Sequence, residues 1–177
     1  MGAAACNVER LPASRRSGLD DRTLDALAEV VLPTELGSPG RAAAVNAFRD
    51  WLAAYEPAAE GIHGYGDQEI TYLPADPAPG WNAQLAQLDA ITRKRYGAAF
   101  ADCDVARRDA VVRGQLAHVR SSDRMPALVN APHVALALLA HWCDSAGATD
   151  LVYSAKIGKE TCRQLAIVTQ SPARSAS

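Results

Sequence analysis

Hydrophobic residues return at every third or fourth position along most of the chain, which is the spacing that places them on one face of an α-helix. The first such run follows Asp20 and Asp21, either of which is suited to cap a helix. Its apolar positions are Leu24, Leu27, Val30 and Val31. Pro33 ends the run because proline lacks a backbone donor. The pattern predicts a first helix over about residues 20–31.

Five further runs of the same kind predict five more helices. They extend over about residues 41–55, 81–96, 104–119, 132–146 and 149–165. The run after Pro132 is apolar nearly all round, so its helix is expected at the centre of the fold, with Gly147 ending it. Strands do not alternate with these helices, and no internal repeat occurs. The sequence therefore predicts an all-α fold, a single-domain helical bundle of about six helices.

Residues 57–80 interrupt the helical pattern with one long loop rich in glycine and proline. Within it, only residues 70–73 have the character of a short extended piece. A loop of this length in a small domain is usually functional or disordered, and its aromatic residues favour an ordered loop that packs or binds. Tyrosine and tryptophan are enriched in protein interfaces, so Tyr65, Tyr72 and Trp81 are candidate contacts to a partner. The sequence leaves open whether these rings face the partner or the core.

The two ends of the chain lack helical periodicity. Residues 1–18 are expected to form a flexible arm, residues 19–168 the helical domain and residues 169–177 a disordered tail. No segment approaches the roughly 20 apolar residues of a membrane span. The pair Arg15-Arg16 is not followed by the apolar segment of a twin-arginine signal. The chain as written is therefore predicted to be cytoplasmic, and periplasmic if its start is truncated.

The charge balance excludes one class of partner. The formal net charge is −2 and the pI is about 6.1. The basic runs are short, and the run Arg93-Lys94-Arg95 is best interpreted as the solvated face of a helix. Nucleic-acid binding requires clustered lysine and arginine on one face, so no nucleic-acid partner is expected.

Histidines are the strongest candidates for chemistry within this chain. His133 and His141 lie eight residues apart on one predicted helix, and so about 80° apart around its axis. A shared metal would need a third ligand, such as His118 or Cys143, whereas zinc ligands usually lie closer together. The simpler interpretation is that His133 helps to start the helix and His141 is hydrogen-bonded in the core. A metal site of His118, His133 and His141 is the alternative.

Cysteine spacing and motif content point away from a self-contained active site. The four cysteines are widely spaced without a CxxC pair, which is compatible with reduced thiols, although a bridge between Cys143 and Cys162 stays open. No GxSxG, HExxH or Walker motif occurs. The segment Gly64-Tyr65-Gly66 begins like a dinucleotide loop but lacks the third glycine. No catalytic residue is assigned, and no cofactor is expected in this chain.

Three segments, taken in order, carry a family resemblance. The first is LDALAEVVLPTE at residues 24–35, a helix that ends in an LPT element; the second is GWNAQLAQLD at residues 80–89, followed by GAAF at 97–100; the third is HVALALLAHW at residues 133–142, with Ile157-Gly158 and Cys162-Arg163 downstream. Together they resemble the gluconate 2-dehydrogenase subunit 3 family over roughly residues 19–167.

The resemblance implies a non-catalytic role in an oxidoreductase complex. In such complexes FAD and the substrate site belong to a large subunit of the glucose–methanol–choline (GMC) type, which in some cases is joined by a multihaem cytochrome c subunit. The small subunit supports assembly of the large one. The alternative is a stand-alone helical metal protein or enzyme that uses histidine and cysteine residues.

Overall fold

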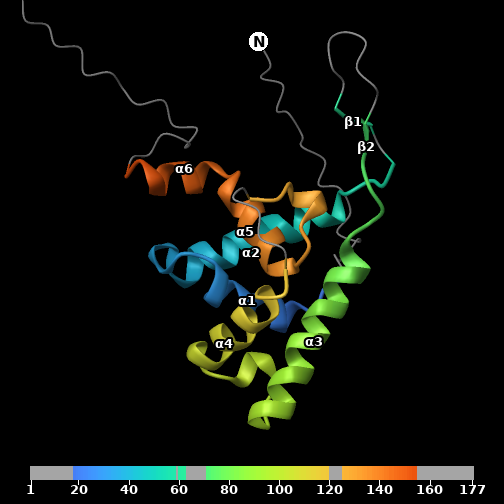
Figure 1. Cartoon of the computed structure of the whole chain (residues 1–177). Coiled ribbons are helices and arrows are strands. Elements are labelled where there is room, and N and C mark those ends of the chain that lie inside the picture. The colour runs from blue at the N-terminus through green and yellow to red at the C-terminus, as the bar shows by residue number, and fades with distance from the viewer. Residues whose placement is uncertain (1–17, 59, 63–70, 120–124, 155–177) are drawn as a thin grey trace, which may run out of the picture.

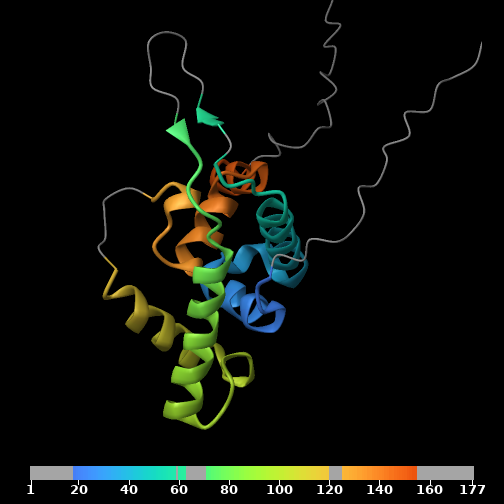
Figure 2. The ribbon, with the colours of Figure 1, turned by 90° about the vertical axis from the view of Figure 1, so that its right-hand side faces the viewer.

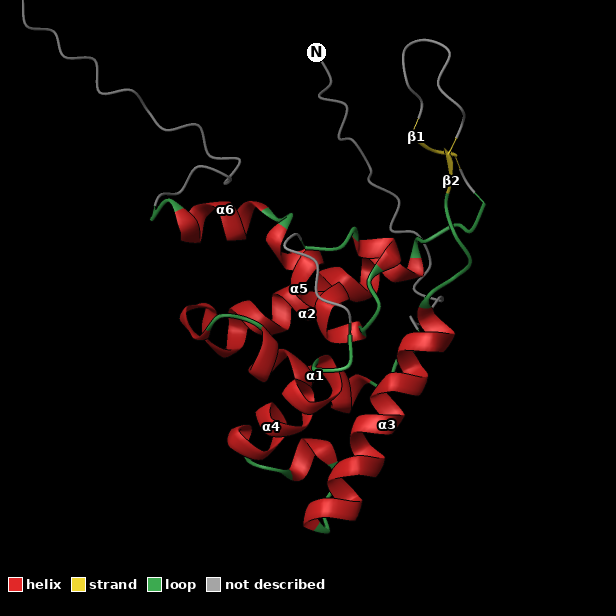
Figure 3. Cartoon of the chain, in the orientation of Figure 1, coloured by secondary structure: helices red, strands yellow, loops and turns green. Residues whose placement is uncertain are grey.

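The computed structural model describes residues 18–58, 60–62, 71–119 and 125–154. The described residues form six α-helices, so the predicted all-α bundle is confirmed (Figures 1 and 3). The helices are α1 (Asp21–Val31), α2 (Gly37–Ala53), α3 (Ala78–Tyr96), α4 (Val105–Leu116), α5 (Val134–Cys143) and α6 (Ala146–Val152). Short 3-10 turns, η1 (Thr34–Leu36), η2 (Phe100–Asp102) and η3 (Leu128–Asn130), connect them.

The core lies where α1 and α5 meet the other helices. Helix α1 contacts α2, α4 and α5, and its Leu24 and Leu27 are fully buried. Helix α5 buries residues around most of its circumference, as its continuous apolar sequence predicts. Its buried side chains are Val134, Ala135, Ala137, Leu138, Ala140 and Trp142. Helix α3 runs along the outside of the bundle in both views (Figures 1 and 2).

Polar side chains cap several helix starts. Asp20, one of the two caps predicted for the first helix, accepts the Thr23 N–H at 3.1 Å, and Asp104 accepts the Arg107 N–H at 2.8 Å at the start of α4. Ser145 caps α6 through the Ala148 N–H. Gly97 ends α3 with φ of 73°, in the left-handed region that glycine adopts without steric cost.

Several predicted helix boundaries are wrong. Helix α2 begins at Gly37 and α3 at Ala78, four and three residues before their predicted starts. Pro39 and Pro79 lie in these first turns, where proline is tolerated because the N–H it lacks has no acceptor within the helix. Gly147, predicted to end α5, lies instead within α6, which begins at Ala146 rather than near residue 149.

The segment between α2 and α3 contains a small hairpin. Strand β1 (Glu60–Ile62) pairs antiparallel with β2 (Thr71–Tyr72), so the short extended piece predicted near residues 70–73 is confirmed. Both views place the two strands beyond the N-terminal end of α3, away from the helices (Figures 1 and 2). Among the described helices, none is long and apolar enough to cross a membrane.

Candidate partner-binding surface and interhelical groove

The base of the hairpin is fixed to the end of α2. The Tyr55 hydroxyl donates to the Pro74 carbonyl at 2.9 Å, and the Ala58 N–H donates to the Leu73 carbonyl at 3.1 Å. Burial, and then the nearby Asp76 carboxylate, raise the pKa of Tyr55 above 10.0, so its hydroxyl stays a donor. The chain therefore leaves α2 and enters β2 and α3 at a defined place.

Two of the three rings predicted to meet a partner lie among the described residues, and one of these two is exposed. Tyr72 on β2 is 58% exposed, so more than half of its surface faces solvent. Tyr65 lies outside the described residues. The hairpin thus presents Tyr72 on a part of the molecule that projects from the bundle (Figure 1).

Trp81 belongs to the core, which corrects its assignment as a candidate interface residue. It is 3% exposed, and its ring centroid lies 5.6 Å from that of Phe48 and 6.3 Å from that of Trp51. Its indole N–H donates to the Ala131 carbonyl at 3.4 Å. The ring joins α3 to α2 and to the segment before α5.

His141 completes this aromatic cluster. Its ring centroid lies 5.6 Å from that of Phe48 and 6.2 Å from that of Trp51. Burial lowers the pKa of His141 below 6.5, against a smaller opposing effect of Asp144. The neutral imidazole therefore serves as a packing ring between α5 and α2.

His133 starts α5, as the simpler interpretation of the sequence predicts. Its Nδ1 accepts the Ala135 N–H at 3.1 Å, and burial lowers the pKa of its imidazole. His118 is exposed after α4. The described residues contain no group of three or more metal-ligating side chains, so His118, His133 and His141 do not form the alternative metal site.

The two described cysteines differ in environment. Cys103 is buried, whereas Cys143 is exposed. Burial of part of its surface, and then Asp144, raise the pKa of the Cys143 thiol, which makes the reactive thiolate scarcer. Cys162 lies outside the described residues, so the bridge between Cys143 and Cys162 stays open, as the sequence leaves it.

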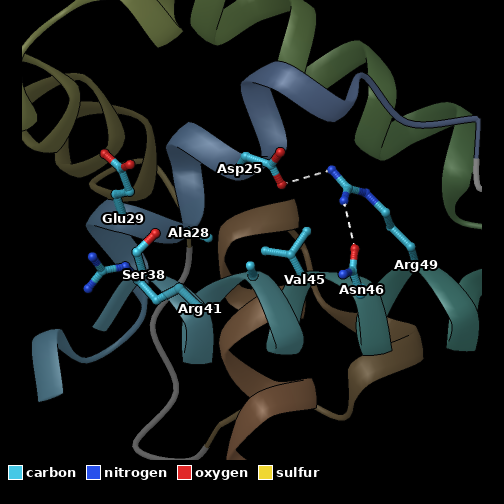
Figure 4. A pocket seen from close by; sticks show the side chains of 9 residues that line it. Asp25, Ala28, Glu29, Ser38, Arg41, Val45, Asn46 and Arg49 are labelled. Carbon is cyan, nitrogen blue, oxygen red and sulfur yellow. Dashed lines mark hydrogen bonds and ion pairs between the residues drawn. The ribbon is translucent and has the colours of Figure 1, made fainter. Parts of the chain in front are cut away.

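A polar groove lies between α1 and α2, with a volume of about 320 Å³ (Figure 4). Ala28 and Val45, both nearly fully buried, line its depth. The polar residues along it are Asp25 and Glu29 from α1 and Ser38, Arg41, Asn46 and Arg49 from α2. Sequence analysis did not identify this groove, although Arg41, Val45 and Arg49 follow at four-residue intervals on one helix face.

Ion pairs close one end of the groove. Arg49 Nη2 lies 2.9 Å from Asp25 Oδ1, and its Nε lies 3.1 Å from Asp21 Oδ1. Arg49 Nη1 also donates to Asn46 Oδ1 at 3.2 Å. At the other end, the Glu29 carboxylate lies 2.7 Å from Nη2 of Arg108, a nearly buried residue of α4. Asp25 and Glu29, the two carboxylates that line the groove, are therefore each paired with an arginine.

These features define a small helical-bundle protein with a projecting hairpin and a charged interhelical groove. The chain belongs to the gluconate 2-dehydrogenase subunit 3 family, because the sequence profile of that family, described as Gluconate 2-dehydrogenase subunit 3, matches residues 20–151. The match covers α1 to nearly the end of α6 and confirms the predicted family. Neither a curated protein nor a solved structure matches the chain.

Proposed function

We propose that this protein is a non-catalytic small subunit that assembles with, and stabilises, a flavin-dependent large subunit of the GMC type acting on a sugar or on gluconate. The observation that carries the proposal is the family match over residues 20–151. A protein that binds the folded state of a partner, and not its unfolded state, stabilises that partner by mass action. FAD and the substrate site belong to the large subunit in this proposal, and a cytochrome c subunit is a further partner in complexes that transfer electrons onward.

The hairpin is the surface that we assign to this partner. It projects from the bundle while its base is fixed by the Tyr55–Pro74 hydrogen bond, so a partner would meet a positioned element. Tyr72 offers a large amphipathic ring with few rotatable bonds, which is the side chain type that dominates many interfaces. A two-stranded sheet also has unpaired backbone groups along its outer edges, to which a partner strand can add.

Co-expression of the tagged chain with a large GMC-type oxidoreductase from the same genome tests the assembly. The expected result is a yellow complex that co-elutes in size exclusion and retains dye-linked dehydrogenase activity, whereas the large subunit expressed alone is less soluble and less active. A colourless chain that elutes alone from the co-expressing cells would contradict the proposal.

Two tyrosine variants locate the contact on the small subunit. Tyr72→Ala is expected to lower the yield of complex, because it removes an exposed ring from the hairpin. Tyr153→Ala is the matched control, since Tyr153 is 68% exposed and follows α6. Equal yields of complex from the two variants would remove the hairpin from the interface while leaving the family assignment intact.

A further inference from the structure

Arg41 holds a positive charge that has no counterion among the described residues. Its guanidinium forms no hydrogen bond or ion pair within the part of the chain that the structure describes, and its Nε is buried without a hydrogen-bond partner. The side chain lies at the end of the α1–α2 groove opposite Arg49, beside Ser38 (Figure 4). A buried donor without an acceptor is costly, and more so on a charged group.

The two neighbouring arginines show what Arg41 lacks. Arg49 and Arg108 also leave Nε without a hydrogen bond, but each pairs a terminal nitrogen with a carboxylate, of Asp25 and of Glu29 respectively. Glu29 lines the same groove as Arg41, yet its Oε2 lies 2.7 Å from Arg108. Arg41 therefore shares its end of the groove with Glu29 but forms no ion pair with it or with any other described residue.

The chemistry of this end favours a single carboxylate as its ligand. The two terminal nitrogens of a guanidinium present parallel N–H groups that match the two oxygens of a carboxylate. The Ser38 hydroxyl at the rim supplies a further donor. Because Asp25 and Glu29 line the same groove, a singly charged carboxylate meets less repulsion there than a doubly charged phosphate.

We propose that the Arg41 end of the groove is a carboxylate-binding site. Because Nε is buried, the two terminal Nη groups of Arg41 hold the carboxylate end-on, and Ser38 donates to one of its oxygens. The carboxylate comes either from a small organic acid or from an aspartate or glutamate side chain that a partner protein inserts into the groove. The second source rests on the proposed function, whereas the site itself does not.

Nitrogen-15 NMR of the full-length chain tests the site directly. The arginine Nε–H signal of Arg41 and the backbone amide signals of Ser38 and Ala42 are followed during titration with sodium acetate. A capped tetrapeptide with one glutamate is titrated separately, and sodium chloride at matched ionic strength controls for screening. The expected result is a saturable shift of these signals with a carboxylate and none with chloride.

Two variants complete the test. Arg41→Gln is expected to abolish the saturable shift at Ser38 and Ala42, whereas Arg95→Lys, at an exposed arginine of α3, leaves it unchanged. Saturation by acetate identifies a small acid as sufficient, and saturation by the peptide alone identifies a protein side chain as the source. Absence of saturation with both, or the same saturation in Arg41→Gln, overturns the site. Because the isolated chain is used, this result is independent of whether the large subunit co-purifies.

Discussion

The Gln84 side chain on α3 pairs with the backbone of Val134 at the start of α5, fifty residues away. Gln84 Oε1 accepts the Val134 N–H at 2.7 Å, while its Nε2 donates to the Pro132 carbonyl at 3.0 Å. The amide thereby satisfies an N–H that has no acceptor within α5 and a carbonyl just before it. Together with the His133 cap, it fixes the place where the most buried helix begins.

Replacing Gln84 is expected to destabilise the fold. Gln84→Ala removes both hydrogen bonds and should lower the free energy of unfolding by about 1–2 kcal/mol. Gln84→Glu keeps the acceptor for Val134 but sets a carboxylate oxygen against the Pro132 carbonyl, so it should also destabilise. The matched control is Gln87→Ala, at an exposed position of α3, which should leave stability nearly unchanged. Urea unfolding followed by circular dichroism measures all three, and equal midpoints for Gln84→Ala and Gln87→Ala would contradict the pairing.

The histidines make stability fall in mild acid. Burial lowers the pKa of His133 and of His141 below the ordinary 6.5, so below about pH 6.5 the unfolded chain binds more protons than the folded one. The contribution of the two neutral histidines to the free energy of unfolding is therefore complete above that pH. It is lost as the pH falls through their lowered pKa values, by about 1.4 kcal/mol for each unit of pKa shift. Urea midpoints at about pH 7.5 and about pH 5.5 measure this loss, because carboxylates scarcely titrate between them.

A single substitution separates the contribution of His133 to this loss of stability from that of His141. Protonation of its Nδ1 would set an N–H against the Ala135 N–H and remove the cap of α5. His133→Asn keeps a capping side chain without a titrating group, so it should show a smaller loss between the two pH values than the wild type. An unchanged pH dependence in this variant would assign the loss to other groups.

Local periodicity was enough to predict the helices and the class of fold. The apolar spacing that defines α1 and α5 is a property of each segment alone, and so are the caps at Asp20 and Asp104. The errors at the starts of α2 and α3 have a local cause as well. Pro39 and Pro79 precede the predicted starts at residues 41 and 81, although the first turn of a helix accommodates proline.

The surface features depend on packing that no single segment encodes. Trp81 is buried because Phe48 and Trp51 of α2 lie against it, and the local sequence around residue 81 does not predict that contact. The spacing of Arg41 and Arg49 places them on one face of α2, but only the folded bundle shows that Asp25 pairs with Arg49. Likewise, Glu29 pairs with Arg108 and not with Arg41, and these partners lie seventy-nine positions apart in the sequence.

Arg108 is expected to stabilise the bundle by joining α4 to α1. Its side chain is nearly buried; Nη1 donates to the Ala26 carbonyl at 2.9 Å, and Nη2 donates to Glu29 at 2.7 Å. Arg108→Ala leaves that carbonyl without this donor and should cost about 1–3 kcal/mol, less than a fully buried pair, because Glu29 is half exposed and regains water. Arg113→Ala breaks the exposed pair with Asp109 on the same helix and should not change stability measurably. Equal thermal midpoints for the two variants would show that Arg108 does not join the helices.

The burial of Trp81 and the exposure of Tyr72 predict opposite behaviour for two rings that the sequence grouped together. Trp81→Ala should lower the free energy of unfolding by about 3–5 kcal/mol, since it empties a site bounded by Phe48 and Trp51. Trp81→Phe keeps most of the side-chain volume, so it should lower the free energy of unfolding by less than Trp81→Ala if packing is the cause of the loss. Tyr72→Ala should change the stability of the isolated chain by less than about 0.5 kcal/mol, because the ring is mostly exposed. Urea unfolding of the chain without its partner measures each value. If Tyr72→Ala destabilised the isolated chain as much as Trp81→Ala, the hairpin would be part of the core, and the ring would not be available to a partner.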